Sequence, residues 1–367
     1  MNQSKPSIAI IIPGGIGTGK GNLGVPVLER LVKLLSKDFE ITVFSLFRVN
    51  HDYRPVGFEV IDVSHRVSLL RFVKLVLSVR QHHRKKAFRV IHGFWALPSG
   101  MFAVLLAKIL NIKSIVSILG GDAIALSQIN YGQLQRPLPR KLILWTLQRA
   151  DVVVVLTRYL LDNLKKAGLT RNEIQIIPWG IDTELFSFKS KPISSPVKIL
   201  HIANLHPVKD QETLLRAFKL ISAQADAHLT IIGEGVLEDQ VKSLAASLNL
   251  HNVSFVDPLP YDRLPEYYQK ADILMHTSLS EGQSEVVTEA MSCGVVVCGT
   301  RVGLLYDIPD SCVSVNVGDY HDLASETLNL LKNPSRFNEL KHNAREWTRM
   351  HSIYWTVEQI KECYAKA

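Results

Sequence analysis

Short runs of apolar, mostly β-branched residues alternate with amphipathic stretches along the whole chain, and this alternation limits the fold more than any other feature. Because these runs are continuously apolar, they predict strands that are buried on both faces of a parallel sheet. The stretches between them, such as 25–36, 211–223, 237–248 and 284–292, have the periodicity of helices that cover such a sheet. The predicted strands are 7–12, 40–47, 57–61, 89–92, 114–118, 151–156, 173–177, 197–202, 228–232, 253–256, 272–276, 295–298 and 313–315.

Two such series in one chain predict an α/β protein with two doubly wound, Rossmann-like parallel-sheet domains. Residues 187–196 are rich in Ser, Lys and Pro and have no periodicity, so we interpret them as a linker. We therefore expect an N-terminal domain over 1–186 and a C-terminal domain over 197–350. Ligands of open parallel sheets bind beyond the carboxyl ends of the strands, which favours a cleft between the two domains as the site.

Composition excludes several classes of protein. With 47% hydrophobic and 21% charged residues, the 367-residue chain can form packed cores and is not disordered. Its four cysteines contain no C-x-x-C pair, which indicates reduced thiols rather than a disulfide framework or a zinc ribbon. The first apolar run is too short for a signal peptide, and the longest uncharged stretch, 90–107, is interrupted by glycine and proline. These features predict a cytoplasmic protein without membrane spans.

Positive charge is concentrated in the first half of the chain. Residues 1–185 carry 25 Lys and Arg against 12 Asp and Glu, whereas the remaining residues are net acidic. From Val63 to Gly121 there are ten basic residues and no acidic one. The first half should therefore attract an anion, and charge alone does not choose between nucleic acid, an anionic membrane and a phosphorylated substrate.

A glycine-rich cluster, Pro13 to Gly21, follows the first predicted strand directly. Gly14 to Lys20 fits G-x-x-x-x-G-K, but Gly21 stands where a phosphate-binding loop needs Ser or Thr. The dinucleotide pattern beginning at Gly19 lies too far beyond the strand, and no acid ends the second strand. Two interpretations stay open: a loop whose backbone approaches an anion or a sugar closely, and a merely flexible turn.

The strongest signal is the segment Glu281 to Val297, which follows the predicted strand 272–276. Glu281 lies in the loop, Ser284 is a good N-cap residue, and Glu289 lies one turn inside the helix that follows. Free N–H groups of a helix suit phosphate or sugar hydroxyls, and a carboxylate suits a vicinal diol. From spacing alone, two solvated surface acids are an equally good interpretation.

The pattern Glu-x7-Glu followed by Ala-Met-x-x-Gly-x-x-Val-Val resembles the signature of the family 4 retaining glycosyltransferases, which have the GT-B fold. The resemblance extends along nearly the whole chain, and its ordered motifs favour a ligand site over surface charges. The supporting segments are His92 to Gly100, Gly120 to Asp122, Ile177 to Phe186, Lys209 to Leu215, Ile232 to Gly235 and Val317 to Asp319.

The resemblance implies a role for each residue at the matching positions. Glu281 would face the donor sugar as a catalytic residue, Glu289 would hold the ribose of a nucleotide sugar, and Lys209 would neutralise the diphosphate leaving group, also as a catalytic residue. The C-terminal domain would bind the donor and the N-terminal domain the acceptor, with the final helix, about 351–367, returning to the N-terminal domain. Other implied donor-side residues are Gly15, Asn204, Gly233, Gln283, Ser284 and Glu285, and the implied acceptor side is His92, Gly120, Gly121 and Asp122.

Three positions depart from the family pattern. Asn204 replaces an arginine, Leu119 replaces a histidine, and Gln283-Ser284 replaces the commoner Phe-Gly. The implied function is transfer of a sugar from a nucleotide sugar to a glycan or lipid-linked acceptor, in cell-surface polysaccharide synthesis, with no metal and no other cofactor. The alternative is a non-catalytic binder of sugar nucleotides or glycans, in which these replacements have abolished turnover.

The basic stretch 65–89 has apolar residues at helical spacing with arginines and lysines among them. It fits a helix on an anionic membrane surface, which would make the protein peripheral to the cytoplasmic membrane face, and it fits an ordinary helix with a solvated basic side equally well. Nucleic-acid binding is not expected, because no recognition motif or aromatic platform accompanies the charges.

Overall fold

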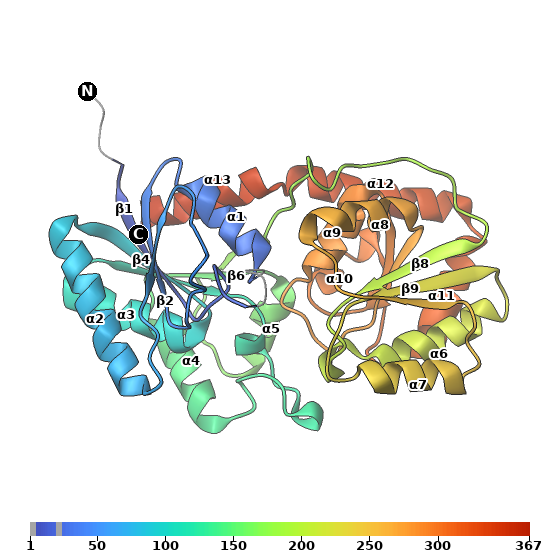
Figure 1. Cartoon of the computed structure of the whole chain (residues 1–367), viewed down its shortest axis with the longest axis horizontal. Helices are drawn as coiled ribbons and strands as arrows, with labels where there is room; N and C mark the ends of the chain where they lie inside the picture. Colours follow the sequence, from blue (N-terminus) through green and yellow to red (C-terminus); the bar gives the residue numbers. More distant parts are fainter. Residues whose placement is uncertain (1–4, 20–23) are drawn as a thin grey trace. The chain divides into compact units, whose positions relative to one another are not determined.

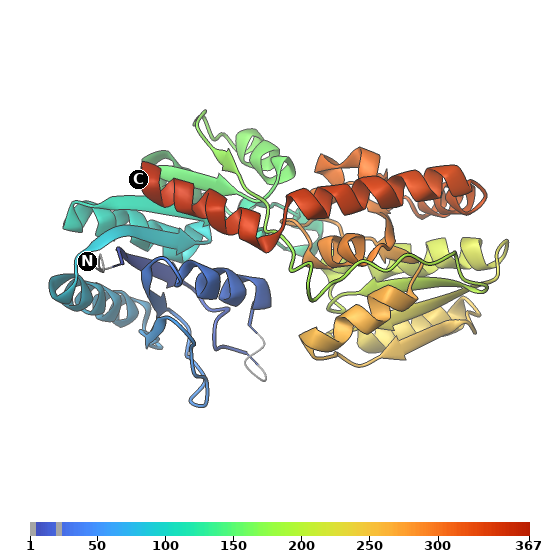
Figure 2. The same cartoon turned by 90° about the horizontal axis from the view of Figure 1, so that it is seen from above.

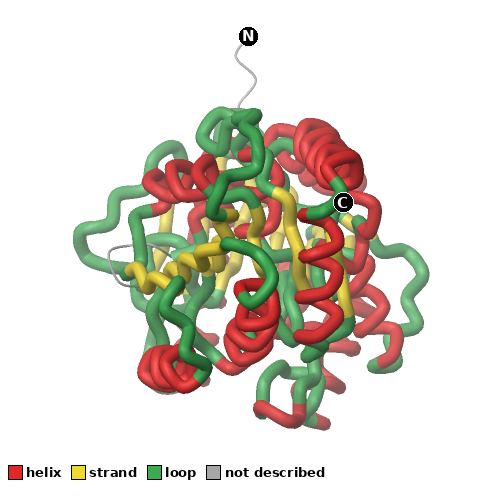
Figure 3. Tube along the Cα trace, turned by 90° about the vertical axis from the view of Figure 1, so that its right-hand side faces the viewer, coloured by secondary structure: helices red, strands yellow, loops and turns green. Residues whose placement is uncertain are grey.

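The computed structural model describes residues 5–19 and 24–367. The chain divides into two compact units. The first unit comprises Met1–Leu156, Leu160–Trp179 and Ile353–Ala367, and the second comprises Thr157–Tyr159 and Gly180–Ser352. Figure 3 shows the strands in yellow and the helices in red.

The first unit is built on a seven-stranded sheet in the order β3-β2-β1-β4-β5-β6-β7, in which every neighbouring pair is parallel. Its strands are β1 (Ser7–Ile12), β2 (Glu40–Ser45), β3 (Glu59–Asp62), β4 (Phe88–Phe94), β5 (Lys113–Ile118), β6 (Val152–Val155) and β7 (Gln175–Ile176). Its helices are α1 (Pro26–Leu35), α2 (Ser68–Lys85), α3 (Met101–Leu110), α4 (Pro137–Arg149), most of α5 (Arg158–Lys166), and α13 (Ile353–Lys366). Figure 1 labels most of these elements.

The second unit is built on a six-stranded parallel sheet in the order β10-β9-β8-β11-β12-β13. Its strands are β8 (Val197–Ile202), β9 (Ala227–Ile232), β10 (Val253–Val256), β11 (Ile273–His276), β12 (Val296–Thr300) and β13 (Val313–Val315). Its helices are α6 (Gln211–Ser222), α7 (Glu238–Ser247), α8 (Leu264–Lys270), α9 (Glu285–Cys293), α10 (Leu304–Asp307), α11 (Tyr320–Leu331) and α12 (Pro334–Met350).

The central strands are largely apolar because both faces of each sheet are covered. Along β8, Ile199 belongs to a core formed with α6, α7 and α11, whereas Leu200 belongs to a second core formed with α8 and α9. Ile273 and Leu274 on β11 divide between the same two cores. The alternation of strands and helices therefore predicted the fold class correctly, and every predicted strand overlaps an observed one.

The expected linker, 187–196, belongs to the second unit, whose main part begins at Gly180. The Arg345 guanidinium stacks 4.0 Å from the centre of the Phe188 ring, and Ile193 packs against the core beside β8. The Ser, Lys and Pro content of this segment predicts a linker, although Phe188 and Ile193 attach it to the second unit. The boundary between the units therefore lies earlier in the structure than the composition predicts.

The C-terminal helix α13 belongs to the first unit, far from the rest of that unit in sequence. Its Tyr364 is 1% exposed, lies 5.3 Å from the Phe39 ring and hydrogen bonds the His92 ring at 3.0 Å. Lys361 pairs with Asp38 at 2.8 Å. Figure 2 shows this red helix beside the strands and helices of the first unit. Among the described residues, no helix is both long and apolar enough to cross a membrane.

We predict that Tyr364→Ala lowers the free energy of unfolding by about 3–5 kcal/mol, because it leaves a large cavity beneath α13. Tyr364→Phe keeps the ring and should cost only about 1 kcal/mol, since it removes one partner of the buried His92. Urea denaturation measures both values. Equal stability of the two variants would contradict this packing role.

Candidate active site

The candidate site lies where the strand order of the second sheet reverses. From β8 the chain adds β9 and β10 on one side, and then returns to add β11 on the other side. Lys209 follows β8, and Glu281 follows β11. Ligands bind at such switch points because the loops after the two neighbouring strands diverge there. The two residues that the sequence placed at the centre of the site therefore lie at the expected end of this sheet.

Lys209 and Glu281 form an ion pair. The Lys209 ammonium donates to Oε1 of Glu281 at 2.5 Å, and the Ser278 hydroxyl donates to the same oxygen at 2.6 Å. Their side chains are 23% and 12% exposed, respectively, so the pair is largely shielded but still reachable. The Thr277 hydroxyl donates to the Lys209 carbonyl at 3.0 Å and fixes the loop after β8 to the loop after β11.

The Lys209 ammonium keeps Glu281 ionised. Burial alone raises the pKa of Glu281, but the positive charge of Lys209, together with His276 and the Ser278 hydrogen bond, lowers it below its usual value overall. A carboxylate and an ammonium are thus held side by side at neutral pH. Such a pair can present a negative group to one part of a ligand and a positive group to another.

Helix α9 begins without a side-chain cap on its first backbone N–H groups. Ser284 occupies the N-cap position with φ at +84°, and its side chain makes no capping hydrogen bond. Ser284 thus occupies the expected N-cap position but makes no capping hydrogen bond there. Gly303, with φ at +54°, packs against the same loop, and a Cβ there would lie 2.7 Å from Cβ of Glu281. Strain and close packing of this kind are typical of ligand-binding loops.

Two more carboxylates follow on α9. Glu289 is 2% exposed and accepts a hydrogen bond from the Tyr268 hydroxyl at 2.6 Å. Burial raises the pKa of Glu289 to about 7, although hydrogen bonds from Tyr268 and Tyr261 oppose the change. Burial and the neighbouring Glu289 raise the pKa of Glu285 to about 8. Both groups thus change charge close to neutral pH.

Three further donor-side residues of the second unit lie in the loops that follow β8, β9 and β11. Asn204 is exposed just beyond β8, where its carbonyl accepts from the Gln211 amide at 3.2 Å. Gly233 follows β9 with φ at +145°, and a Cβ there would lie 2.0 Å from the Ala203 carbonyl oxygen. Gln283 is buried, and its carbonyl accepts from Leu304 N–H at 3.0 Å. These residues shape the loops, and only Asn204 presents an exposed side chain.

In the first unit, the predicted residues follow β1 and β5. Gly15 has φ at +103°, donates its N–H to the Thr18 hydroxyl at 2.8 Å and accepts from Val25 N–H at 2.7 Å, so its loop folds back on itself. Asp122 is 1% exposed and accepts from the N–H groups of Ala96 and Gly120 at 2.8 and 2.9 Å. It thereby fixes the Gly120–Gly121 loop. Lys20 and Gly21 of the glycine cluster lie outside the described residues.

His92 lies within β4 and is completely buried. One ring nitrogen hydrogen bonds the Tyr364 hydroxyl at 3.0 Å, and the other hydrogen bonds the Ser117 hydroxyl at 2.8 Å. Burial lowers the pKa of its ring to about 3, so the ring is neutral. Both ring nitrogens already form hydrogen bonds within the core, so neither is left to bind an acceptor substrate. The structure therefore contradicts the acceptor-side role that the resemblance implied for His92.

Several residues at the site carried no clear signal in the sequence. Tyr268 reaches Glu289 from another helix, and nothing local connects two positions so far apart. Ser278 and Gly303 are ordinary loop residues until the fold brings them to Glu281. His276 did carry a signal, since it is the only polar residue in the last four positions of an otherwise apolar strand.

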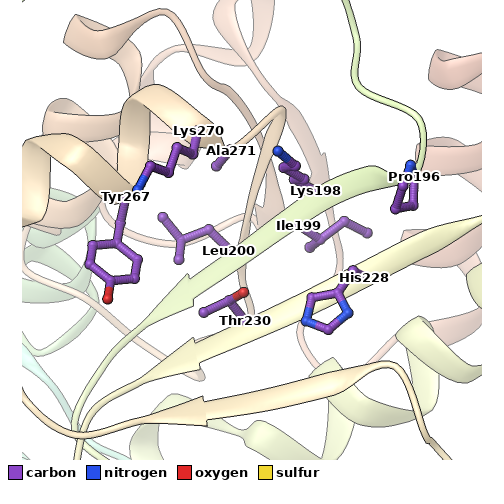
Figure 4. Close-up of a pocket in the computed structure, with 9 residues that line it drawn as sticks. All are labelled: Pro196, Lys198, Ile199, Leu200, His228, Thr230, Tyr267, Lys270 and Ala271. Atoms are coloured by element: carbon purple, nitrogen blue, oxygen red, sulfur yellow. The ribbon is translucent and has the colours of Figure 1, made fainter.

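The cavity in Figure 4 is distinct from this site. It has a volume of about 310 Å³ and lies along the amino-terminal parts of β8 and β9, beside Tyr267 and Lys270 of α8. Ligands of parallel sheets bind at the opposite, carboxyl ends. Over 5–19 and 24–367, no group of three His, Cys, Asp or Glu residues is placed to hold a metal ion.

Comparison with proteins of known structure supports the fold. Sucrose-phosphate synthase from Thermosynechococcus elongatus superimposes with a TM-score of 0.82 at 20% identity, over 99% of each chain. HepE of Anabaena, solved in complex with UDP, gives a TM-score of 0.79 at 17% identity, over 98% of this chain and 100% of HepE. At these identities the likeness shows the fold alone, and it confirms the expected GT-B class.

Comparison of sequences identifies the family. The chain is 25% identical to N-acetyl-alpha-D-glucosaminyl L-malate synthase of Bacillus anthracis over 346 residues, 89% of this chain and 88% of that protein. It is 22% identical to an uncharacterized glycosyltransferase of Methanocaldococcus jannaschii over 348 residues, 92% of each. Residues 25–185 match the model of Glycosyltransferase Family 4, and residues 182–347 match that of Glycosyl transferases group 1. The chain therefore belongs to glycosyltransferase family 4 and is a glycosyltransferase with the GT-B fold.

Proposed function

We propose that the protein transfers a sugar from a nucleotide-sugar donor to a glycan or lipid-linked acceptor, with retention of the anomeric configuration. The observation that carries the proposal is the convergence of Lys209, Glu281 and the uncapped start of α9 at one switch point. HepE, which shares the fold, was solved in complex with UDP and with UDP-glucose, and this supports a nucleotide sugar as donor.

In this proposal the second unit binds the donor. The Lys209 ammonium and the N–H groups at the start of α9 bind the diphosphate, because both favour negative charge. Glu281 faces the donor sugar, and the Glu289 carboxylate accepts hydrogen bonds from the ribose hydroxyls. Tyr268 holds Glu289 in position for this from the adjacent helix.

Bond cleavage moves charge in a direction that this site favours. When the anomeric C–O bond breaks, negative charge develops on the nucleoside diphosphate and positive charge develops on the sugar. In this proposal, Lys209 and the helix N–H groups stabilise the first. Glu281 and the departing diphosphate stabilise the second, which resembles an oxocarbenium ion. Metal independence remains a prediction, checked by turnover in the presence of EDTA.

We assign the acceptor to the first unit, in which the Gly120–Gly121 backbone follows β5. Asp122 acts there as the support of the loop rather than as a contact, since Ala96 and Gly120 occupy both of its oxygens. The family assignment favours an enzyme over a non-catalytic binder, although Asn204 and Leu119 leave fewer donor contacts than an arginine and a histidine would. Cell-surface polysaccharide synthesis is the proposed setting.

We predict that Lys209→Ala lowers turnover roughly 100-fold or more, the scale for loss of one group that stabilises a developing anion. The matched control is Lys191→Ala, because Lys191 also pairs with a buried carboxylate, that of Asp272, within the same unit. Release of nucleoside diphosphate from the donor measures both. Near-normal turnover of Lys209→Ala, or an equal loss in both variants, would remove Lys209 from this role.

We predict that donor affinity falls about tenfold between pH 8 and pH 6. The pKa of Glu289 is about 7, so its carboxylate is ionised and accepts the ribose hydroxyls above that pH and is protonated below it. Glu289→Gln should bind the donor weakly at both pH values, whereas Glu285→Gln should keep the pH dependence. Calorimetric titration with the intact nucleotide sugar measures these affinities, and a pH-independent wild type would contradict the assignment.

We also propose that α2 holds the protein on an anionic membrane surface. Leu69, Leu70, Val73 and Leu77 form an apolar stripe along α2, and these side chains are 69%, 49%, 43% and 62% exposed. The opposite face of the helix is buried through Leu75 and Val79. An exposed apolar stripe on a surface helix is unusual unless something covers it.

Charge around the α2 stripe indicates the chemistry of that partner. Arg66, Lys74, Arg80 and Arg84 are exposed near it, and between Val63 and Ala150 Asp122 is the one acidic residue. Asp122 is 1% exposed and does not offset this charge at the surface. A basic surface with an apolar stripe fits an anionic leaflet, where each basic residue contributes about 1 kcal/mol. The protein would then be peripheral to the cytoplasmic membrane face, close to a lipid-linked acceptor.

We predict that the protein sediments with vesicles of phosphatidylglycerol and phosphatidylcholine at low salt and not with phosphatidylcholine alone. Replacing Leu70, Val73 and Leu77 by serine should weaken this binding at least tenfold, since three apolar groups leave the interface. Val236→Ser, at an 80% exposed position of the second unit, serves as control. Equal binding of the triple variant and wild type would show that α2 is not the contact.

A further inference from the structure

His276, the last residue of β11, lies beneath the Lys209–Glu281 pair without a part in the proposed chemistry. Its side chain is 2% exposed, and its Nε2 lies 3.5 Å from Oε1 of Glu281, slightly beyond a hydrogen bond. Over 5–19 and 24–367, no group hydrogen bonds this nitrogen. A buried polar atom without a hydrogen-bond partner destabilises a fold. We therefore expect a state of the site in which Nε2 of His276 gains a partner.

The charged and titratable groups around His276 are His201 on β8, Lys209 and Glu281. Burial lowers the pKa of both histidines to about 4, so both rings are neutral at neutral pH. The His201 ring donates from Nδ1 to the Met275 carbonyl at 2.9 Å, which leaves its Nε2 able only to accept. Of the two rings, His276 is therefore the one that can donate to Glu281.

Donor binding creates a conflict at Lys209, and this step rests on the proposed function. The same ammonium that now neutralises Glu281 would have to neutralise the diphosphate. If Lys209 turns to the phosphates, Glu281 stays behind as a shielded carboxylate with only the Ser278 hydroxyl on Oε1. A buried charge that loses its partner is strongly unfavourable, so donor binding would be weakened unless another group replaced the lysine.

We propose that His276 is a positioning residue that donates its Nε2–H to Glu281 when Lys209 turns to the donor diphosphate. A small rotation of the glutamate closes the 3.5 Å gap to hydrogen-bond length. Glu281 then keeps two donors on Oε1, His276 and Ser278, and its orientation toward the donor sugar is retained. The neutral ring adds no charge, so the full positive charge of Lys209 is left for the diphosphate.

The test is titration of UDP, GDP and ADP into wild type, His276→Gln and His276→Leu by calorimetry. Glutamine places an N–H donor near the position of Nε2, so this variant should bind the preferred nucleotide within about twofold of wild type. Leucine fills the space without a donor, and this variant should bind about tenfold more weakly. In a Lys209→Met background, His276→Leu should have no further effect, because no lysine remains to be released.

His228→Leu controls for loss of a partly buried histidine in the same unit, where the ring hydrogen bonds Ser254 at 2.9 Å, and it should bind normally. Thermal unfolding of each variant separates misfolding from weak binding. Equal binding by the glutamine and leucine variants, or an undiminished leucine effect in the Lys209→Met background, would overturn the inference alone. Failure of wild type to bind any of the three nucleotides would contradict the proposed function, and this inference with it.

Discussion

The ion pair between Lys209 and Glu281 is the interaction on which the rest of the site depends. It exists because parallel strands end at one edge of the sheet, and because β8 and β11 are neighbours there although far apart in sequence. Two opposite charges are tolerated in this shielded position only as a pair. If a ligand binds the Lys209 ammonium, another group must then neutralise or hydrogen bond the Glu281 carboxylate. Ligand binding is thereby coupled to the arrangement of the loops that carry the two residues.

Residues around the ion pair position other groups of the candidate site. The strained Ser284 leaves the start of α9 without a side-chain cap, while Tyr268 holds Glu289 one turn further along the same helix. In the proposed function, the donors for the diphosphate and the acceptor for the ribose hydroxyls thus lie on one short helix. In the first unit, Asp122 orders a glycine loop instead of meeting a ligand. In the proposed function, buried carboxylates thus have two roles, since Glu289 faces a ligand and Asp122 fixes backbone.

The sequence predicted both sheets and the family, because continuously apolar strands and ordered motifs are properties of local segments. It could not predict that Phe188 and Ile193 anchor a Ser- and Pro-rich segment to the second unit. Nor could it predict that Tyr364 of α13 is buried in the first unit and hydrogen bonds the His92 ring. The pairing of Tyr268 with Glu289 was missed for the same reason. Each of these depends on contacts between residues that only the fold brings together.

Release of free nucleoside diphosphate from a panel of nucleotide sugars, with and without membrane extract, tests the central claim most directly. We predict release from at least one donor by the wild-type protein. We also predict that this release is lost in Glu281→Gln, which keeps the shape of the side chain and removes its charge. Tight binding of a nucleotide sugar with no release under either condition would contradict it, and would identify the protein as a binder.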